Sequence, residues 1–365
     1  TLFGKAAMRD VDERPNRLLY ALIVLVFLGY FFAAAEPLQK ELALHPVWAG
    51  DVSRDSDPKP STDPALTLSF HLGGRYGAVT PDGTRIWSRG AAFDAAVSDS
   101  LFLPYERESK ALSAFTPGGD PAFRIQAEGW PFFRSGRLFL MSPEMDSVSE
   151  YSPEGEPLWS YDFPFKITDF DATESLAVAG LLDGSIECVD ADGKSVLSFA
   201  PGGSRIEVTL GVALDPREEA IAAVCGADRQ RFILLVRKGG AFKVQYHKYL
   251  DSDYREPVTV RFTGDGRYVL YRQSEGIAVY DRQTGRESLL PLRAESFELA
   301  SDASRGLEYL FFRAARTGGV VCFEPPARVI FSYPLPGGAL WTRHVDRSLY
   351  LGSGAVLGRI DISEE

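Results

Sequence analysis

The chain has 365 residues, 45% of them hydrophobic and 12% aromatic, which is enough apolar material for a large core and argues against a disordered chain. Its formal net charge of -11 argues against broad nucleic-acid binding, because neutralising phosphates requires a basic surface. The 34 glycines and 23 prolines are spread at turn spacing, which favours many short strands over a few long helices.

The first predicted element is a transmembrane helix over residues 18–35, LLYALIVLVFLGYFFAAA. Eighteen residues without a charge would span about 27 Å, close to the thickness of the bilayer hydrocarbon. Basic residues precede the segment, so the positive-inside rule predicts a cytoplasmic segment 1–17 and an exported remainder. The anchor would include Arg17, Leu18, Leu25 and Phe32. Two alternatives remain open, namely a signal peptide cleaved after Ala35 and a buried globular helix.

Residues 36–65 are predicted to form a linker or stalk between the anchor and a domain at 66–365. Its second part, DVSRDSDPKPSTDP, is polar and rich in proline, as linkers are. The stalk would hold the domain away from the membrane.

From residue 66 onward, short runs of alternating apolar residues are separated by turn residues. The segment SIECVDADGKSVLSF (185–199) predicts two strands joined by an Asp-Gly turn, and similar hairpins recur at 77–88, 149–160 and 277–290. Residues 258–292 contain a complete unit of four strands. We therefore predict an all-β fold built from one repeated four-stranded unit.

Seven such units can be aligned, with spacings of about 36 to 50 residues, as four-stranded propeller blades require. They begin near Phe93, Gly129, Ile167, Val208, Val258, Phe297 and Leu340. Seven blades are therefore predicted, with strands from the two ends of the chain expected to share one blade. Residues 66–88 leave one strand over in this count, so eight blades remain the alternative.

These repeats resemble the β-propeller superfamily of WD-repeat, YVTN and quinoprotein-like (PQQ-like) repeats, over roughly residues 66–363. The likeness lies in the repeat length and in turns such as Asp82-Gly83, Asp192-Gly193 and Asp265-Gly266. Trp87 and Trp159 follow the turns directly, which is similar to quinoprotein-type repeats. An N-terminal membrane segment before a propeller also resembles envelope assembly factors, in which the propeller is a docking platform.

No catalytic, cofactor or metal site is predicted. The three cysteines, Cys188, Cys225 and Cys322, form no CxxC pair, and the four histidines are not paired at ligand spacing. The vicinal cysteines that the resemblance to quinone-dependent enzymes would imply are absent. The Asp-Gly turns lack the further carboxylates of a complete calcium loop.

The fifth unit contains the most individual segment, RKGGAFKVQYHKYLDSDYREP (237–257), which mixes basic and aromatic residues in an acidic chain. Interface cores favour tyrosine and phenylalanine, so the segment is a candidate partner-binding patch. The alternative is a long outer hairpin with solvated charges. The candidate residues are Phe242, Lys243, Tyr246, His247, Lys248, Tyr249 and Tyr254.

The sequence thus predicts a non-catalytic, single-pass protein of the cytoplasmic membrane whose exported propeller is a scaffold for protein partners in an envelope complex. The alternative is a propeller enzyme or ligand sensor that binds a sugar, peptide or quinone in the central channel. That alternative requires polar residues that converge from the innermost strands, and the predicted unit starts show only scattered aspartates.

Overall fold

The computed structural model describes residues 17–34, 42–57, 67–315, 317–336 and 340–364. The chain divides into two units, one comprising Thr1–Glu41 with Glu364–Glu365 and the other comprising Leu42–Ser363. In its described part the first unit contains helix α1 (Arg17–Ala34), and the second contains the strands.

The prediction of a transmembrane helix at 18–35 requires a correction. The described helix α1 has 18 residues and begins with the charged Arg17. Among the described residues, no helix has the length and apolar character needed to cross a membrane. Of the predicted anchor residues, Leu25 is exposed, while the side chains of Arg17, Leu18 and Phe32 lie outside the described part, as does the predicted cytoplasmic segment up to residue 16.

The strands form eight antiparallel sheets within the described residues, seven of four strands and one of three. The three-stranded sheet contains β2 (Leu68–Leu72), β3 (Arg75–Val79) and β4 (Arg85–Gly90). The next three sheets contain β5 (Asp94–Val97), β6 (Phe102–Tyr105), β7 (Leu112–Phe115) and β8 (Pro121–Ile125); β9 (Trp130–Arg134), β10 (Arg137–Met141), β11 (Ser147–Tyr151) and β12 (Pro157–Asp162); and β13 (Ile167–Ala172), β14 (Leu176–Leu181), β15 (Ile186–Asp190) and β16 (Ser195–Phe199).

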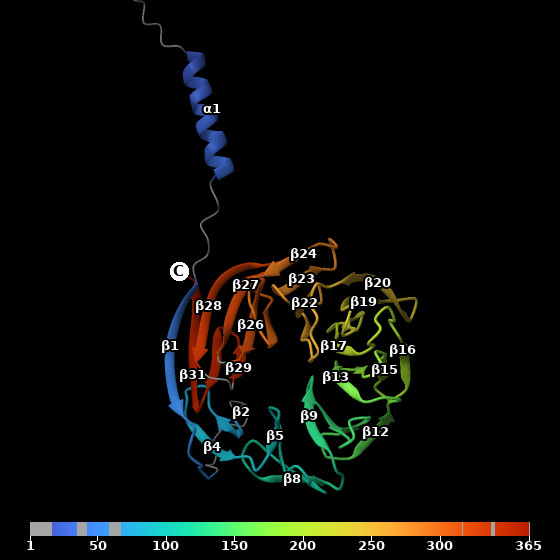
Figure 1. The fold of residues 1–365 in the computed structure, drawn as a ribbon. Coiled ribbons are helices and arrows are strands. Elements are labelled where there is room, and N and C mark those ends of the chain that lie inside the picture. Colours follow the sequence, from blue (N-terminus) through green and yellow to red (C-terminus); the bar gives the residue numbers. More distant parts are fainter. Residues whose placement is uncertain (1–16, 35–41, 58–66, 316, 337–339, 365) are drawn as a thin grey trace, which may run out of the picture. The chain divides into compact units, whose positions relative to one another are not determined.

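The remaining four sheets complete the ring drawn in Figure 1. They contain β17 (Thr209–Leu214), β18 (Ala220–Cys225), β19 (Arg231–Lys238) and β20 (Ala241–Tyr249); β21 (Val260–Phe262), β22 (Tyr268–Gln273), β23 (Gly276–Asp281) and β24 (Glu287–Leu290); β25 (Ser296–Asp302), β26 (Leu307–Ala314), β27 (Thr317–Glu324) and β28 (Arg328–Pro336); and β29 (Leu340–Val345), β30 (Ser348–Ser353), β31 (Val356–Glu364) and β1 (Leu42–Asp51).

The ring is a β-propeller of eight blades, so the prediction of seven is wrong and its alternative is right. Each of the seven predicted unit starts lies within two residues of an innermost strand. The uncounted blade is β2–β4, which the prediction treated as strand material left over at the start of the domain. An isolated bridge between Ser56 and Ser88 extends this blade at its outer edge.

Closure of the ring uses residues predicted to be linker. Strand β1 pairs with β31 as the outermost strand of the last blade, so the predicted linker 36–65 contains a strand at Leu42–Asp51. His45 Nε2 lies 2.8 Å from Ser363 Oγ, and Trp48 Nε1 donates to Pro81 O at 2.9 Å in the neighbouring blade. The two ends of the strand-forming region therefore share one blade, as expected.

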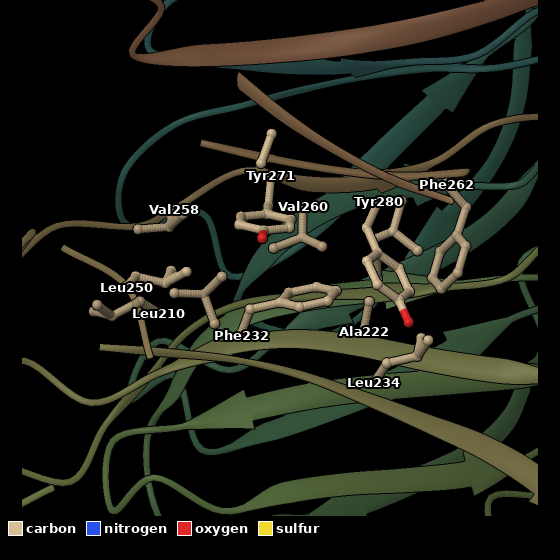
Figure 2. Close-up of a cluster of buried hydrophobic side chains, with 14 of the residues drawn as sticks. Leu210, Ala222, Phe232, Leu234, Leu250, Val258, Val260, Phe262, Tyr271 and Tyr280 are labelled. Carbon is tan, nitrogen blue, oxygen red and sulfur yellow. The ribbon is translucent and has the colours of Figure 1, made fainter. Parts of the chain in front are cut away.

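The core lies between blades, because alternation along each strand gives a blade two apolar faces that it cannot bury alone. Figure 2 shows one such layer, where Phe232 of β19 lies against Tyr271 of β22 with ring centroids 4.2 Å apart. Both side chains are fully buried. Every blade is thus stabilised by its neighbours.

The turn between the last two strands of a blade is covered by an aromatic residue of the preceding outermost strand. A Cβ atom at Gly193, where φ is +74°, would lie 2.9 Å from the Trp159 ring, and one at Gly83, where φ is +89°, would lie 2.6 Å from Trp48. Glycine is needed at both turns for the left-handed backbone and for this close approach. The predicted Asp-Gly hairpins are therefore also contacts between blades.

Candidate interaction surface

One face of the ring carries the connections that lead from the outermost strand of each blade to the innermost strand of the next. We call it the connection face. The turns between second and third strands lie on the same face, as backbone hydrogen bonds show. Leu182 N in the β14–β15 turn donates to Lys166 O in the β12–β13 connection at 2.9 Å, and Ile167 N donates to Met145 O at 2.6 Å.

Four large apolar side chains are exposed on the connection face over three consecutive blades, from β9 to β20. Met145 and Leu182 occupy equivalent turns, and Phe165 and Ile206 occupy equivalent connections. Their exposed fractions are 41%, 53%, 50% and 49% in the same order. We call these four residues the apolar arc.

Local backbone structure holds Leu182 and Met145 outward. In the turn at Leu182, Gly184 N donates to Leu181 O at 3.0 Å, and Asp183 Oδ1 accepts a hydrogen bond from Ser185 N at 3.0 Å. The turn is satisfied by its own polar groups, so Leu182 stays at the corner in solvent while Leu181 is fully buried. Met145 similarly occupies a left-handed position, with φ of 58°.

The segments that carry the arc are in contact with one another. Phe163 N donates to Asp146 O at 2.7 Å, which joins the β12–β13 connection to the β10–β11 turn. Ala227 N donates to Ile206 O at 3.1 Å, which joins the β16–β17 connection to the β18–β19 turn. Each arc residue therefore lies on a segment that is hydrogen-bonded to a neighbouring segment of this edge.

An aromatic cluster lies beside the arc on the same face. Phe93, Tyr105 and Trp130 have ring centroids 5.8 to 6.0 Å apart, and the Arg107 guanidinium lies 5.1 Å from the Phe93 ring centroid. Phe93 is 43% exposed. The cluster adds a large, rigid contact area of the kind enriched at protein interfaces.

The two faces differ in the apolar residues that they expose. Within the described propeller residues, the large hydrophobic residues exposed in turns and connections all lie on the connection face. Near the opposite face the exposed ones lie in strands: Val345, 37% exposed, ends β29, and Leu158, Val196 and Val329 lie at the start of outermost strands. Large apolar residues that gather on one face are characteristic of interaction sites, whereas single exposed residues are ordinary. The connection face is thus the stronger candidate for binding a partner.

Comparison with known proteins identifies the family. The family model described as beta-propeller protein matches residues 12–365. The chain belongs to the beta-propeller family. A relative, an uncharacterized protein of Treponema pallidum (strain Nichols), is 30% identical over 276 residues, which cover 73% of each chain. The more specific likeness to quinoprotein-type repeats stays a prediction.

Solved propellers share the fold at low sequence identity. BamB from Moraxella catarrhalis is 14% identical, with a TM-score of 0.60 over 87% of this chain and 100% of that one. The computationally designed Ika8 protein is 12% identical, with a TM-score of 0.60 over 87% of this chain and 99% of that one. The WD40 domain of Toxoplasma gondii coronin is 13% identical, with a TM-score of 0.56 over 89% and 87% of the two chains. These likenesses establish architecture alone.

The propeller divides the predicted patch on β20 between its interior and its surface. Phe242 is only 9% exposed and packs in the core next to the preceding blade. Tyr246 stacks on Tyr280 with centroids 4.5 Å apart, Lys248 Nζ lies 2.7 Å from Glu287 Oε1, and Tyr254 lies under the Arg272 guanidinium at 4.0 Å. These four side chains are engaged in packing and pairing with the propeller itself.

The other three patch residues, Lys243, His247 and Tyr249, are exposed. Tyr249 lies at the connection face, where the Arg229 guanidinium is 4.2 Å from its ring centroid. A partner site on β20 would therefore have to use these three side chains. The arc was missed because its residues look like ordinary strand ends in the sequence.

The innermost strands of the propeller carry more charge than the sequence suggested. Asp169 and Asp171 on β13 accept hydrogen bonds from Val212 N and Leu214 N at 2.8 and 2.9 Å, and Arg261 on β21 binds Glu298 on β25 at 2.6 Å. Burial raises the pKa of Asp169 to about 6. These groups join adjacent blades, and no group of three or more potential metal ligands occurs among the described residues.

The opposite face of the propeller contains a cleft of about 560 Å³ between the blades that begin with β21 and β25. Glu308 lies in its wall, is 6% exposed and accepts hydrogen bonds from Ser301 Oγ at 2.7 and 2.9 Å. Burial raises the pKa of Glu308 from 4.5 to about 7. Its charge therefore changes near neutral pH.

This raised pKa predicts a measurable pH dependence of stability. As pH rises from about 4.5 to 7, the unfolded chain releases the Glu308 proton while the folded chain retains it, so folding stability falls across that window. We expect the unfolding free energy of Glu308→Gln, relative to that of the wild type, to be about 2 kcal/mol higher at pH 8 than at pH 5. Urea denaturation at both pH values measures this difference. Glu324→Gln, on an exposed wall of the same cleft, serves as control, and an equal gain there would contradict the assignment.

Proposed function

We propose that this propeller is a non-catalytic scaffold that binds a protein partner through the connection face. The observation that carries the proposal is the apolar arc of Met145, Phe165, Leu182 and Ile206, which exposes large hydrophobic side chains on one face of three adjacent blades. Removing such side chains from water on binding favours association. The aromatic cluster at Phe93 extends the same surface.

The rigidity of the face supports this role. The arc residues lie on short turns and connections whose backbones are hydrogen-bonded to neighbouring blades. A preformed surface loses little conformational entropy on binding, which favours affinity. The expected location of the propeller outside the cytoplasm stays a prediction.

The test compares exposed apolar residues on the two faces. Tagged wild type, Leu182→Asp and Val345→Asp are expressed at native level, cross-linked in cells and purified, and bound proteins are quantified by mass spectrometry. We expect the amount of partner recovered with Leu182→Asp to be at least tenfold lower than with wild type or Val345→Asp. The reason is that a carboxylate buried without a pairing group at the interface opposes association.

Circular dichroism should show all three proteins equally folded, since both substituted residues are exposed. Equal partner recovery by Leu182→Asp and wild type would reject the connection face as the binding surface. Absence of any partner in stoichiometric amount would reject the scaffold.

A further inference from the structure

The charges that border the apolar arc suggest what kind of partner it binds. Exposed carboxylates flank the arc residues from the β8–β9 connection to the β16–β17 connection. The acidic residues are Glu128, Glu144, Asp146, Asp162 and Glu207. Among the described residues, Glu128, Glu144, Asp162 and Glu207 have no cation within ion-pair distance.

Basic residues on the same edge are fewer. Arg205 Nε pairs with Asp228 Oδ2 at 3.1 Å, and Arg229 lies over the Tyr249 ring. Lys166, next to Phe165, and Arg229 are exposed cations there without an ion pair among the described residues. The arc is therefore an apolar stripe with an acidic border.

We infer that the arc binds an amphipathic helix of a partner protein, whose apolar face is flanked by lysine and arginine. This inference rests on the proposed scaffold function and adds the chemistry of the partner. Opposite charges around an apolar contact increase both the association rate and the specificity. The same acidic border disfavours a second copy of this chain and an anionic lipid surface, because like charges would meet.

The repeat of the blades favours a helix over an extended segment. Sheets pack about 10 Å apart, so Met145 and Leu182, in equivalent turns of adjacent blades, repeat at roughly that distance. In a helix, residues i and i+7 lie on one face about 10.5 Å apart. In a strand, about 10 Å corresponds to about three residues, so two side chains separated by that distance point to opposite sides. Two blade spacings correspond to a helix of about 14 residues.

The test uses a fluorescein-labelled 14-residue amphipathic peptide of leucine and lysine, with a leucine and glutamate peptide of the same pattern for comparison. Fluorescence anisotropy measures binding to the full chain. The charge-reversal variant is Glu144→Lys with Glu207→Lys, and its control is Glu174→Lys with Glu219→Lys. The control residues are exposed glutamates on turns of the opposite face, so both variants change the net charge equally.

We expect the arc variant to bind the lysine peptide about tenfold more weakly and the glutamate peptide more tightly, while the control changes either affinity by less than about twofold. Leu182→Asp should also lose the lysine peptide. Equal weakening by both charge variants would show attraction to net charge alone and overturn the inference. Binding of the arc to phosphatidylglycerol vesicles in place of the peptide would also overturn the inference. So would binding of the arc to a second copy of the chain, measured by sedimentation.

The two proposals fail in distinguishable ways. If Leu182→Asp abolishes partner binding in cells but charge reversal leaves peptide binding unchanged, the scaffold stands and the basic helix is rejected. If Leu182→Asp changes neither readout, the arc itself is rejected.

Discussion

Replacing Phe232 by alanine should lower the free energy of unfolding by about 3 to 5 kcal/mol, the range for deleting a buried aromatic side chain. Phe232 is fully buried between two blades and lies nearly parallel to Tyr271, at an interplanar angle of 11° (Figure 2). Its ring also lies 6.0 Å from Tyr280 and 6.2 Å from Tyr246. The substitution would remove one side of this aromatic layer and leave a cavity.

Chemical denaturation with matched m-values measures this loss. Phe232→Leu is the control, and it should cost less than half as much because leucine fills much of the space. Val244→Ala, an exposed position on the neighbouring strand, should change stability by less than about 0.5 kcal/mol. A loss below about 1 kcal/mol for Phe232→Ala would contradict the view that contacts between blades dominate stability.

Asp215→Ala should cost about 3 to 5 kcal/mol, because it leaves a charge buried without its partner. Asp215 is fully buried in the β17–β18 turn, and its Oδ2 accepts a hydrogen bond from Arg282 Nη1 at 2.6 Å in the next blade. Arg282 is itself only 13% exposed, so water could replace the carboxylate only in part.

A double-mutant cycle separates this pair from its surroundings. Asp215→Ala combined with Arg282→Ala should be less destabilising than the sum of the two single substitutions, with a coupling of at least about 1 kcal/mol. Arg217→Ala is the control, because its guanidinium is 3.9 Å from Asp215 and is 55% exposed. Strict additivity of Asp215→Ala and Arg282→Ala would contradict a direct interaction across the two blades.

The repeat of the blades could be read from local sequence, because each hairpin carries its own alternation and turn residues. The innermost strands at Ile167 and Leu340 were predicted to the residue. The number of blades was not predicted correctly, because the last blade is completed by β1, whose pairing partner lies far along the chain. His45 in β1 contacts a residue 318 positions away. Pro46 and the short apolar pattern of β1 look like a linker until that partner is known.

The interaction surface was harder to predict than the fold. Leu181 and Leu182 are adjacent and identical, yet one is fully buried and the other is 53% exposed. Only the geometry of the turn distinguishes them. The predicted patch had the opposite problem, because Phe242 and Tyr246 have the composition of an interface but pack inside the propeller.

The pairing of β1 with β31 has a consequence for synthesis on the ribosome. Most blades consist of strands that follow one another directly, so they can form while translation continues. Strand β1 emerges before the other described strands and finds its partner only when β31, the last of the described strands, has been made. Until then its unpaired edge is a site for association with other nascent chains or for chaperone binding.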